Sequence, residues 1–365
     1  MAEHYTVRPY TYGDEEQIVE LLELSFTGWP KFNLSRPPLE HWRWKYLDNL
    51  FNLTLIAVVE LDGRIIGCWH RIPQKIKFGE IITFVGQGVD VAVHPDFQGR
   101  GMSSKLREVT LDISKKNDIS MALGINTNPK LRKSENRRGA KDIATLFGMI
   151  KIDDVDLHFD MRKIEHSFMK KYGYNLLKIK NKIGKLKVFN SYEQVQEFHI
   201  DTIDKFDAGI DDFWREIERE YDFIVLKNKE YLNWRYCDPC GGKYVIKQAV
   251  YNDHILGYSV LRINERVKEY PLGSIVDLLA LPQRFDVAEA LIKDALLFFD
   301  NMNVNSVNCW QFQNNYYKIY MNHGFINTGS LFFQYTLFDD NLSLPNSSLF
   351  SPENIHFALG DSDWI

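Results

Sequence analysis

The sequence predicts an α/β protein made of two similar units, each a mixed β-sheet flanked by helices. The chain has 365 residues, which exceeds one domain of ordinary size and suits two. Residues 89–106 read as a strand, a glycine-containing loop and a helix in direct succession. Landmarks of the first half also return in the same order in the second half, as an internal repeat requires.

Four landmarks define the repeat: a tryptophan-basic-tyrosine motif, a strand with a tight turn and a second strand, a strand that ends at proline, and a closing glycine. In pairs they are Trp44–Tyr46 and Trp234–Tyr236, Leu61–Gly67 and Tyr251–Gly257, Val89–Pro95 and Val276–Pro282, and Gly139 and Gly324. In both halves the tyrosine precedes the glycine of the second landmark by 21 positions. We therefore expect each half to contain strands, helices and turns in the same order.

The stretch from Val89 to Leu106 carries the strongest functional signal. Apolar residues alternate over 89–93 as in a strand, and Pro95 removes a backbone donor, so the strand should end there. Small residues then let the backbone approach a ligand closely. A helix that begins near Met102 would direct its free N–H groups and positive dipole end at this loop. The pattern therefore predicts an anion-binding loop.

Three other kinds of loop also contain closely spaced glycines. The glycines Gly99 and Gly101 alone are also compatible with a tight turn that holds no ligand. A Rossmann loop fits less well, because the third glycine position, counted from Gly99, is Ser104. A Walker loop is excluded by the absence of Gly-Lys-Ser/Thr.

The spacing Gln98-x-x-Gly101-x-Ser103 resembles the Q/R-x-x-G-x-G/A signature of the GNAT superfamily of acyl-CoA N-acyltransferases, with Ser103 in place of the usual Gly or Ala. The resemblance implies tandem GNAT-like domains and a loop whose amides hold the pyrophosphate of coenzyme A. It also implies that the preceding strand pairs with the pantetheine arm. The coenzyme-binding residues that it predicts are Val91, Ala92, Val93, Gln98, Gly99, Arg100, Gly101, Met102, Ser103, Ser104 and Asn128.

The second copy lacks glycine after Pro282, so we expect it to be degenerate and to shape the acceptor site. The expected division is a GNAT domain with the acyl-CoA loop over 1–163, a basic linker or hairpin over 164–190, a degenerate GNAT-like domain over 191–340 and a C-terminal tail over 341–365. The lysine-rich run 178–187 is interpreted as connection, because the chain as a whole is acidic.

Two residues are candidates for proton transfer. Asp90 lies on the strand that would present the thioester, and burial would raise its pKa toward the range of a general base; Asp277, at the matching place of the second copy, supports a structural role instead. The tyrosine that protonates the leaving thiolate in this family is replaced by Glu135 in the first copy and present as Tyr320 in the second. Asn128 has a second reading as a turn residue before Pro129.

Composition restricts the partners. A net charge of −5 and a pI near 6.1 predict neither a nucleic-acid nor a membrane partner, and with no signal pattern or long apolar run we expect a cytoplasmic protein. Four cysteines are too few for a disulfide scaffold, and the lone Cys237/Cys240 pair predicts no metal site; its role stays open. Acetyl-CoA or another acyl-CoA is the expected cosubstrate, without a metal.

The predicted activity is transfer of an acyl group, in the simplest case acetyl, from acyl-CoA to a primary amine of a small molecule. The Trp44–Tyr46 and Trp234–Tyr236 motifs resemble those of tandem GNAT-like proteins linked with surface-polysaccharide and amino-sugar pathways, which favours an amino sugar or sugar nucleotide. The alternatives are a non-catalytic acyl-CoA-binding or regulatory protein and a Fem-type aminoacyl transferase. The sequence leaves the oligomeric state open.

Overall fold

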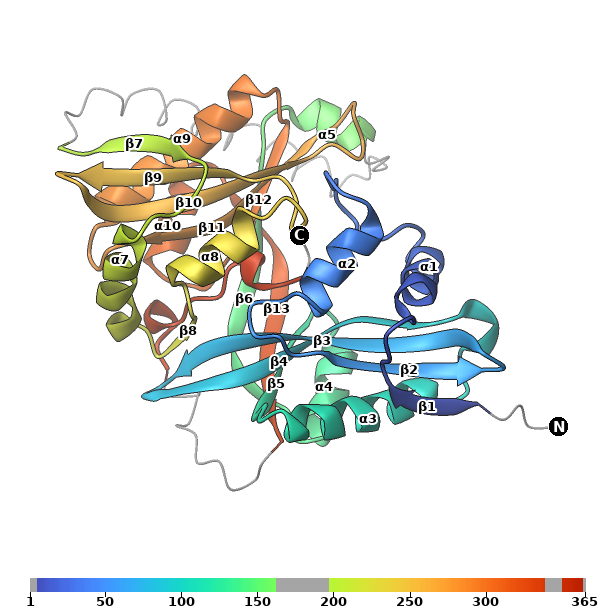
Figure 1. Ribbon diagram of the computed structural model, residues 1–365. Helices are drawn as coiled ribbons and strands as arrows, with labels where there is room; N and C mark the ends of the chain where they lie inside the picture. Colours follow the sequence, from blue (N-terminus) through green and yellow to red (C-terminus); the bar gives the residue numbers. More distant parts are fainter. Residues whose placement is uncertain (1–4, 162–196, 339–349, 364–365) are drawn as a thin grey trace.

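The computed structural model describes residues 5–161, 197–338 and 350–363 (Figure 1); the linker predicted over 164–190 lies outside these residues. We call 5–161 the first half and 197–338 the second half. The strands are β1 (Thr6–Pro9), β2 (Leu55–Leu61), β3 (Arg64–Phe78), β4 (Ile81–Val93), β5 (Met121–Asn126), β6 (Lys141–Ile152), β7 (His199–Ile203), β8 (Phe223–Val225), β9 (Val245–Tyr251), β10 (His254–Asn264), β11 (Leu272–Ala280), β12 (Ser306–Gln311) and β13 (Ile326–Leu337). The helices are α1 (Glu15–Ser25), α2 (Pro38–Tyr46), α3 (Met102–Lys116), α4 (Pro129–Arg137), α5 (Val155–Met161), α7 (Gly209–Ile217), α8 (Lys229–Tyr236), α9 (Phe285–Asn301) and α10 (Asn315–Asn322).

The strands form one mixed sheet whose order reads almost the same from either end: β1-β2-β3-β4-β5-β13-β6-β12-β11-β10-β9-β7, with β8 on β3. Corresponding strands of the two halves occupy mirrored places in this order. The last strand of each half is exchanged, because β13 pairs with β5 and β6 pairs with β12. The two exchanged strands pair with each other in the centre of the molecule (Figure 1). The predicted α/β fold of two similar units, each a mixed sheet flanked by helices, is thereby confirmed.

Helices cover both faces of the sheet because consecutive strand residues, which point to opposite faces, are apolar. In β2, Ile56 and Val58 pack with α1 and α2 on one face, whereas Ala57 and Val59 pack with α3 on the other. The buried residues of α3 recur every fourth position from Met102 to Ser114, which gives the helix a single buried stripe. No helix within the described ranges is long and apolar enough to cross a membrane.

Both predicted hairpins are present. Asp62 and Gly63 join β2 to β3 with φ of 49° and 78°, and Asn252 and Asp253 join β9 to β10 with φ of 48° and 62°. Two consecutive residues with positive φ match the twist of the flanking strands, and Asp, Asn and Gly adopt this conformation at least cost. The repeat found in the sequence therefore corresponds to the same turn chemistry in both halves.

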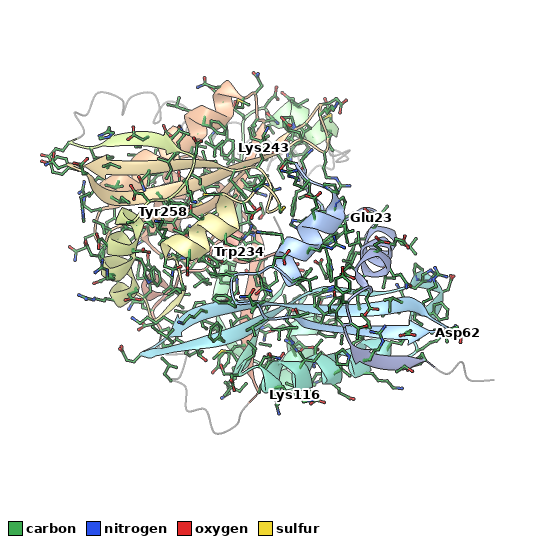
Figure 2. All side chains as sticks on the ribbon, viewed as in Figure 1. Glu23, Asp62, Lys116, Trp234, Lys243 and Tyr258 are labelled. Atoms are coloured by element: carbon green, nitrogen blue, oxygen red, sulfur yellow. The ribbon has the colours of Figure 1, made fainter. Side chains whose placement is uncertain are left out.

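The repeated tryptophan motifs meet each other between the halves. α2 carries Trp44 and α8 carries Trp234, and their rings stack with centroids 4.9 Å apart and planes inclined by 25°. Figure 2 labels Trp234 on the side of α8 that faces α2. Offset-stacked aromatic rings contribute about 0.5–1.5 kcal/mol beyond the area they bury. Equivalent positions of the repeat thus hold the two halves together.

Residues 350–363, from the segment predicted as a tail, are inserted into the core. Ile355, Phe357 and Leu359 belong to the largest apolar cluster, which contains residues of both halves. Asp361 forms an ion pair with Lys227, whose Nζ also lies 2.7 Å from Asp277. Burial alone would lower the pKa of Lys227, but these two carboxylates outweigh burial and raise it. The buried lysine therefore connects the second half to the C-terminal segment.

We expect Lys227→Met to lower the free energy of unfolding by about 3–5 kcal/mol, because it leaves the buried carboxylates of Asp277 and Asp361 without their cation. Urea denaturation measures this loss. The control Arg215→Met removes an exposed cation that pairs with Asp212 and should cost under about 1 kcal/mol. Equal losses in the two variants would contradict a dominant role for the buried pair.

Candidate active site

The loop between β4 and α3 has the geometry of an anion site. Gly99 and Gly101 have φ of 77° and 76°, and no other atom lies within 4 Å of the position that a Cβ would take at either residue. The Gln98 amide group is fixed by donating to the Val93 carbonyl oxygen at 3.1 Å. α3 begins directly after Gly101 and has no acidic residue in its first turn. Its free N–H groups therefore face an exposed loop that no carboxylate of that turn neutralises.

The corresponding place in the second half is filled by the protein itself. α9 starts with Asp286 in its first turn, and the Arg284 guanidinium pairs with this carboxylate at 2.7 Å. That hydrogen bond, together with backbone N–H groups at the helix start, lowers the pKa of Asp286. A fixed carboxylate thus takes the position where α3 leaves room for a ligand.

β4 and β5 pair only briefly and then separate. Their parallel pairing covers Val85–Gln87 and Met121–Leu123, and ends before Gly88 and Gly124. A cavity of about 240 Å³ lies beside this point, between α3 and α4. Its wall includes residues from β13 of the second half: Gln334, Thr336 and, just after the strand, Phe338. The groove therefore depends on the exchanged strand.

Two residues predicted from the sequence lie on α4. Glu135 lines the groove and forms ion pairs with Arg107 at 3.1 Å and Arg138 at 2.9 Å. Asn128 caps the helix by accepting a hydrogen bond from the Lys130 N–H at 2.9 Å. The wall of the groove contains Asn126, the last residue of β5, and not Asn128. The assignments of Glu135 to proton transfer and of Asn128 to the coenzyme stay predictions.

Asp90 lies at a β-bulge in β4. Cys68 pairs with Ala92 and His70 with Val89, so Asp90 and Val91 together oppose one residue of β3. Asp90 has φ of 44°, a conformation that few residues other than glycine adopt. Bulges of this kind redirect side chains and release backbone groups from the ladder. Here the bulge directs the Asp90 carboxylate to the face covered by α1 and α2.

Three donors hold the Asp90 carboxylate. Trp29 Nε1 donates at 2.9 Å, Lys45 Nζ at 3.0 Å, and the Tyr46 hydroxyl also donates to it. Burial alone would raise the pKa of Asp90, but the charge of Lys45, the neighbouring His70 and these hydrogen bonds outweigh burial and lower it. A carboxylate stabilised as the anion is a weak base. The assignment of Asp90 as general base stays a prediction, and its surroundings favour a positioning role.

The second half repeats this arrangement. Asp277 accepts hydrogen bonds from Tyr236 and Tyr258, each at 3.1 Å, and from Lys227. Tyr236 and Tyr46 are the tyrosines of the two repeated motifs. An acid on the fourth strand from each end of the sheet that accepts from the tyrosine of the repeated motif is therefore part of the architecture.

A pocket of about 370 Å³ opens beside Asp90. Three aromatic side chains and a proline line it together with two lysines and a second carboxylate: Phe26, Trp29, Phe32, Pro30, Lys31, Lys45 and Asp363. Burial raises the pKa of Asp363 to about 6; Lys45 opposes this increase, and the Asp90 charge adds to it. Two carboxylates with different pKa values thus face one pocket.

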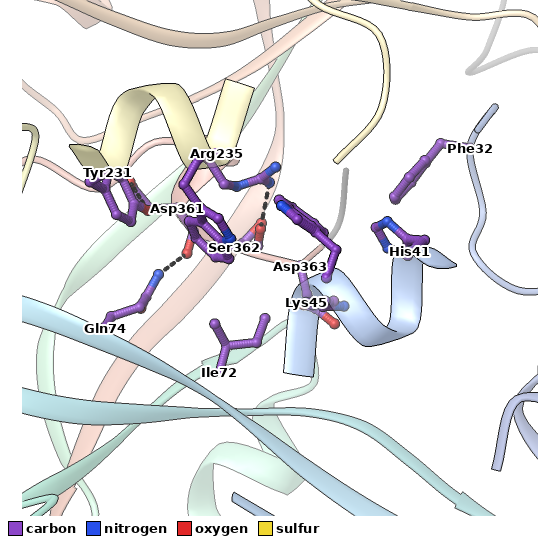
Figure 3. A pocket seen from close by; sticks show the side chains of 12 residues that line it. Phe32, His41, Lys45, Ile72, Gln74, Tyr231, Arg235, Asp361, Ser362 and Asp363 are labelled. Atoms are coloured by element: carbon purple, nitrogen blue, oxygen red, sulfur yellow. Dashed lines mark hydrogen bonds between the residues drawn. The ribbon is translucent and has the colours of Figure 1, made fainter. Parts of the chain in front are cut away.

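Asp363 is carried to the pocket by the inserted C-terminal segment. Figure 3 shows this segment between Gln74 of β3 and Arg235 of α8. Gln74 Nε2 donates to the Asp361 carbonyl oxygen at 2.6 Å, and Arg235 donates to the carbonyl oxygens of Gly360 and Ser362 at 2.8 and 3.3 Å. Sequence reasoning missed Asp363 and Lys45, although Lys45 stands inside the Trp44–Tyr46 motif.

The second half also holds the loop that forms the outer wall of the pocket. Arg262 donates to the Asn33 carbonyl oxygen at 3.0 Å, and its guanidinium lies 3.9 Å from the centre of the Phe32 ring. Asn264 and Arg266 donate to the carbonyl oxygens of Lys31 and Pro30 at 3.0 and 3.1 Å. Across the described parts of the chain, no group of three or more His, Cys, Asp or Glu residues is arranged to hold a metal ion.

Comparisons with known proteins find a family match in the first half and solved structures with a similar fold. A family described as acetyltransferase (GNAT) domain matches residues 6–134. No curated protein matches the chain significantly in sequence. A GCN5-related N-acetyltransferase from Anabaena variabilis shares the fold with a TM-score of 0.61 and 10% identity over 92% of this chain and 73% of that chain. N-myristoyltransferase from Saccharomyces cerevisiae with bound myristoyl-CoA gives a TM-score of 0.62 and 13% identity over 92% and 79%. A probable N-acyltransferase from Enterococcus faecalis gives 0.60 and 10% over 92% and 73%.

The raised pKa of Asp363 has a measurable effect on stability. Its folded pKa of about 6 lies above its ordinary value of 3.8, so the folded state binds the proton more tightly and loses stability as pH rises from 4 to 6. Asparagine does not ionise. Asp363→Asn should therefore be more stable than the parent at pH 7, by about 1–2 kcal/mol in urea denaturation, and equal to it near pH 4.

The matched control is Asp286→Asn. Since Arg284 lowers the pKa of Asp286, this variant should lose stability at pH 7, which is the opposite sign. A stability difference for Asp363→Asn that does not change between pH 4 and pH 7 would contradict the raised pKa.

Proposed function

We propose that the chain is an acyltransferase of the GNAT superfamily that moves an acyl group from coenzyme A to the primary amine of a small molecule. One observation carries the proposal: the anion loop at the start of α3 and the carboxylate pocket at Asp90 lie at the two ends of the same bulged segment of β4. The loop is suited to a pyrophosphate. The pocket is suited to an ammonium group.

The proposed route of the coenzyme follows β4. Residues Gln98–Ser104 hold the pyrophosphate, and the pantetheine arm runs along Val91–Val93 into the groove where β4 leaves β5. The bulge at Asp90 supplies backbone donors that the ladder does not use, and one of them is placed to polarise the thioester carbonyl. Only the first half binds the coenzyme, because Asp286 takes the equivalent place at α9.

The acceptor enters from the opposite face, through the pocket of about 370 Å³. Aromatic walls such as Trp29 and Phe32 suit the flat apolar faces of a sugar ring, which supports an amino sugar or sugar nucleotide as acceptor. Asp363 accepts the ammonium proton, since a pKa of about 6 suits a base near neutral pH. Beside Asp363, Lys45 forms an ion pair with Asp90 and keeps the Asp90 carboxylate ionised.

Glu135 supports a second candidate function. It replaces the tyrosine expected from the resemblance, and both Arg107 and Arg138 hold its carboxylate. A chain without a thiolate acid would bind acyl-CoA and transfer slowly or not at all. Release of thiol in the presence of an amine panel distinguishes an enzyme from an acyl-CoA-binding protein.

Gly101→Val should reduce the affinity for coenzyme A at least tenfold in calorimetry, because a β-branched residue does not hold φ near 76° and the amide cradle is lost. Gly63→Val is the matched control, since Gly63 has φ of 78° and equally open surroundings in the β2–β3 turn. Both variants carry the same backbone strain. Equal affinity in the two variants would contradict the loop assignment.

The identity of the base is tested with Asp363→Asn and Asp90→Asn. We expect Asp363→Asn to lower kcat by roughly 10²–10⁴ at neutral pH, with recovery at higher pH where the free amine is present. It should also abolish the rise of kcat/KM near pH 6. Asp90→Asn should retain that rise and lose stability, because Lys45 loses its partner. The reverse pattern would assign the proton to Asp90, as predicted from the sequence.

A further inference from the structure

Arg71 is a buried cation in the middle of β3, with only 4% of its surface exposed. Its guanidinium lies 5.0 Å from the centre of the Phe338 ring. Its side chain packs over Gly86, and Gly88 follows on the neighbouring strand. Arg71 thus reaches the groove at the point where β4 and β5 separate.

No hydrogen bond or ion pair of Arg71 is found among the described residues, and its Nε is a buried donor without an acceptor. The nearest acid of the groove, Glu135, is already paired with Arg107 and Arg138. Burial, and then the charge of Arg107, lower the pKa of Arg71 to about 10. Burial of an unpaired guanidinium is costly, so an anion that enters the groove would be strongly favoured there.

A second donor faces the same space. Trp69, two residues before Arg71 on β3, lines the groove, and its Nε1 is also buried without a partner. A Cβ at Gly88 would lie 3.6 Å from Trp69 Nε1 and 3.9 Å from Arg71 Nη1. The missing side chain of Gly88 therefore leaves space beside both donors. Such an arrangement is suited to a carboxylate, which accepts hydrogen bonds through two oxygens.

The position relative to the coenzyme identifies which part of the ligand would carry the anion. From Val93 to Gly88 the strand covers roughly 17 Å at the rise of an extended chain. A pantetheine arm laid along β4 from the loop at Gly101, with its thioester at the bulge at Asp90, thus directs the acyl group toward Gly88. The group that reaches Arg71 is the acyl end of the thioester, and the pyrophosphate stays at the start of α3.

We infer that the acyl donor carries a second carboxylate, as the mono-thioester of a short dicarboxylic acid with coenzyme A, and that Arg71 with Trp69 binds this carboxylate beside Gly88. The inference rests on the proposed function and specifies its donor. In the reaction the amine nitrogen forms a C–N bond to the thioester carbon, and the C–S bond breaks. The amine loses a proton, the thiolate gains one, and the distal carboxylate is unchanged. The product is an amide that bears a free carboxylate.

Calorimetry on the full chain with succinyl-CoA, malonyl-CoA, acetyl-CoA and free coenzyme A tests this inference. The parent should bind at least one of the two dicarboxylic thioesters about 10- to 100-fold more tightly than acetyl-CoA. In Arg71→Met this preference should disappear, while affinities for acetyl-CoA and coenzyme A stay within about threefold of the parent. Arg71→Lys keeps the charge without the bidentate geometry and should retain part of the preference.

Two controls make the outcomes distinct. Arg284→Met removes a guanidinium paired with Asp286 in the second half and should not change the preference. Thermal unfolding shows that Arg71→Met is folded; without ligand its Tm should equal or exceed that of the parent, because an unpaired buried charge is removed.

Parent affinities that are equal for acetyl-CoA and both dicarboxylic thioesters would overturn the inference and leave the proposed function intact. So would an equal loss of all four ligands in Arg71→Met, which would assign Arg71 to the pantetheine arm. Failure of coenzyme A itself to bind the parent would instead overturn the proposed function.

Discussion

The pairing of β6 with β13 is the interaction on which the rest of the structure depends. Each of these strands comes from one half of the chain and lies against the sheet of the other half. Because β13 supplies Gln334 and Thr336 to the groove beside β5, the first half has no complete groove by itself. The loop that carries Lys31 and Asn33 is likewise fixed by β10 of the second half. The second half therefore contributes directly to the groove and to the pocket wall of the first half.

Asp90 and Asp277 occupy matching places in the two halves but have different surroundings. Asp277 is closed in by Lys227 and two tyrosines, and the adjacent Asp361 completes a sealed network. Asp90 has the same tyrosine and a lysine, yet an aromatic pocket opens beside it. The difference follows from the C-terminal segment, which places Asp361 against the second copy and Asp363 against the first. The inserted segment thus completes the network around Asp277 and places a second carboxylate beside Asp90.

Local signals in the sequence predicted much of the fold. The strand, loop and helix over 89–106 have the predicted order, and the turns at Asp62–Gly63 and Asn252–Asp253 have the backbone geometry that their residue types favour. These features depend on neighbours in the chain. The strand exchange, the insertion of Asp363 and the unpaired state of Arg71 depend on residues far apart in sequence, and no spacing rule reports them. The positive φ of Asp90 was missed for the same reason, since it arises from the register between β3 and β4.

In the first half, the two faces of the sheet carry different charged groups, and the proposed reaction uses both faces. On the face of α3 and α4, the helix start and Arg71 offer positive charge to an anionic donor. On the face of α1 and α2, the carboxylates of Asp90 and Asp363 share the pocket with Lys31 and Lys45. The bulge at Asp90 is the place where the two approaches meet, because there the backbone leaves the ladder. In the proposed reaction, the donor therefore approaches on the face of α3 and α4 and the acceptor on the face of α1 and α2. In the proposed reaction, the ammonium group of the acceptor gives its proton to Asp363, whose pKa is about 6. The neutral amine that results then moves toward the thioester.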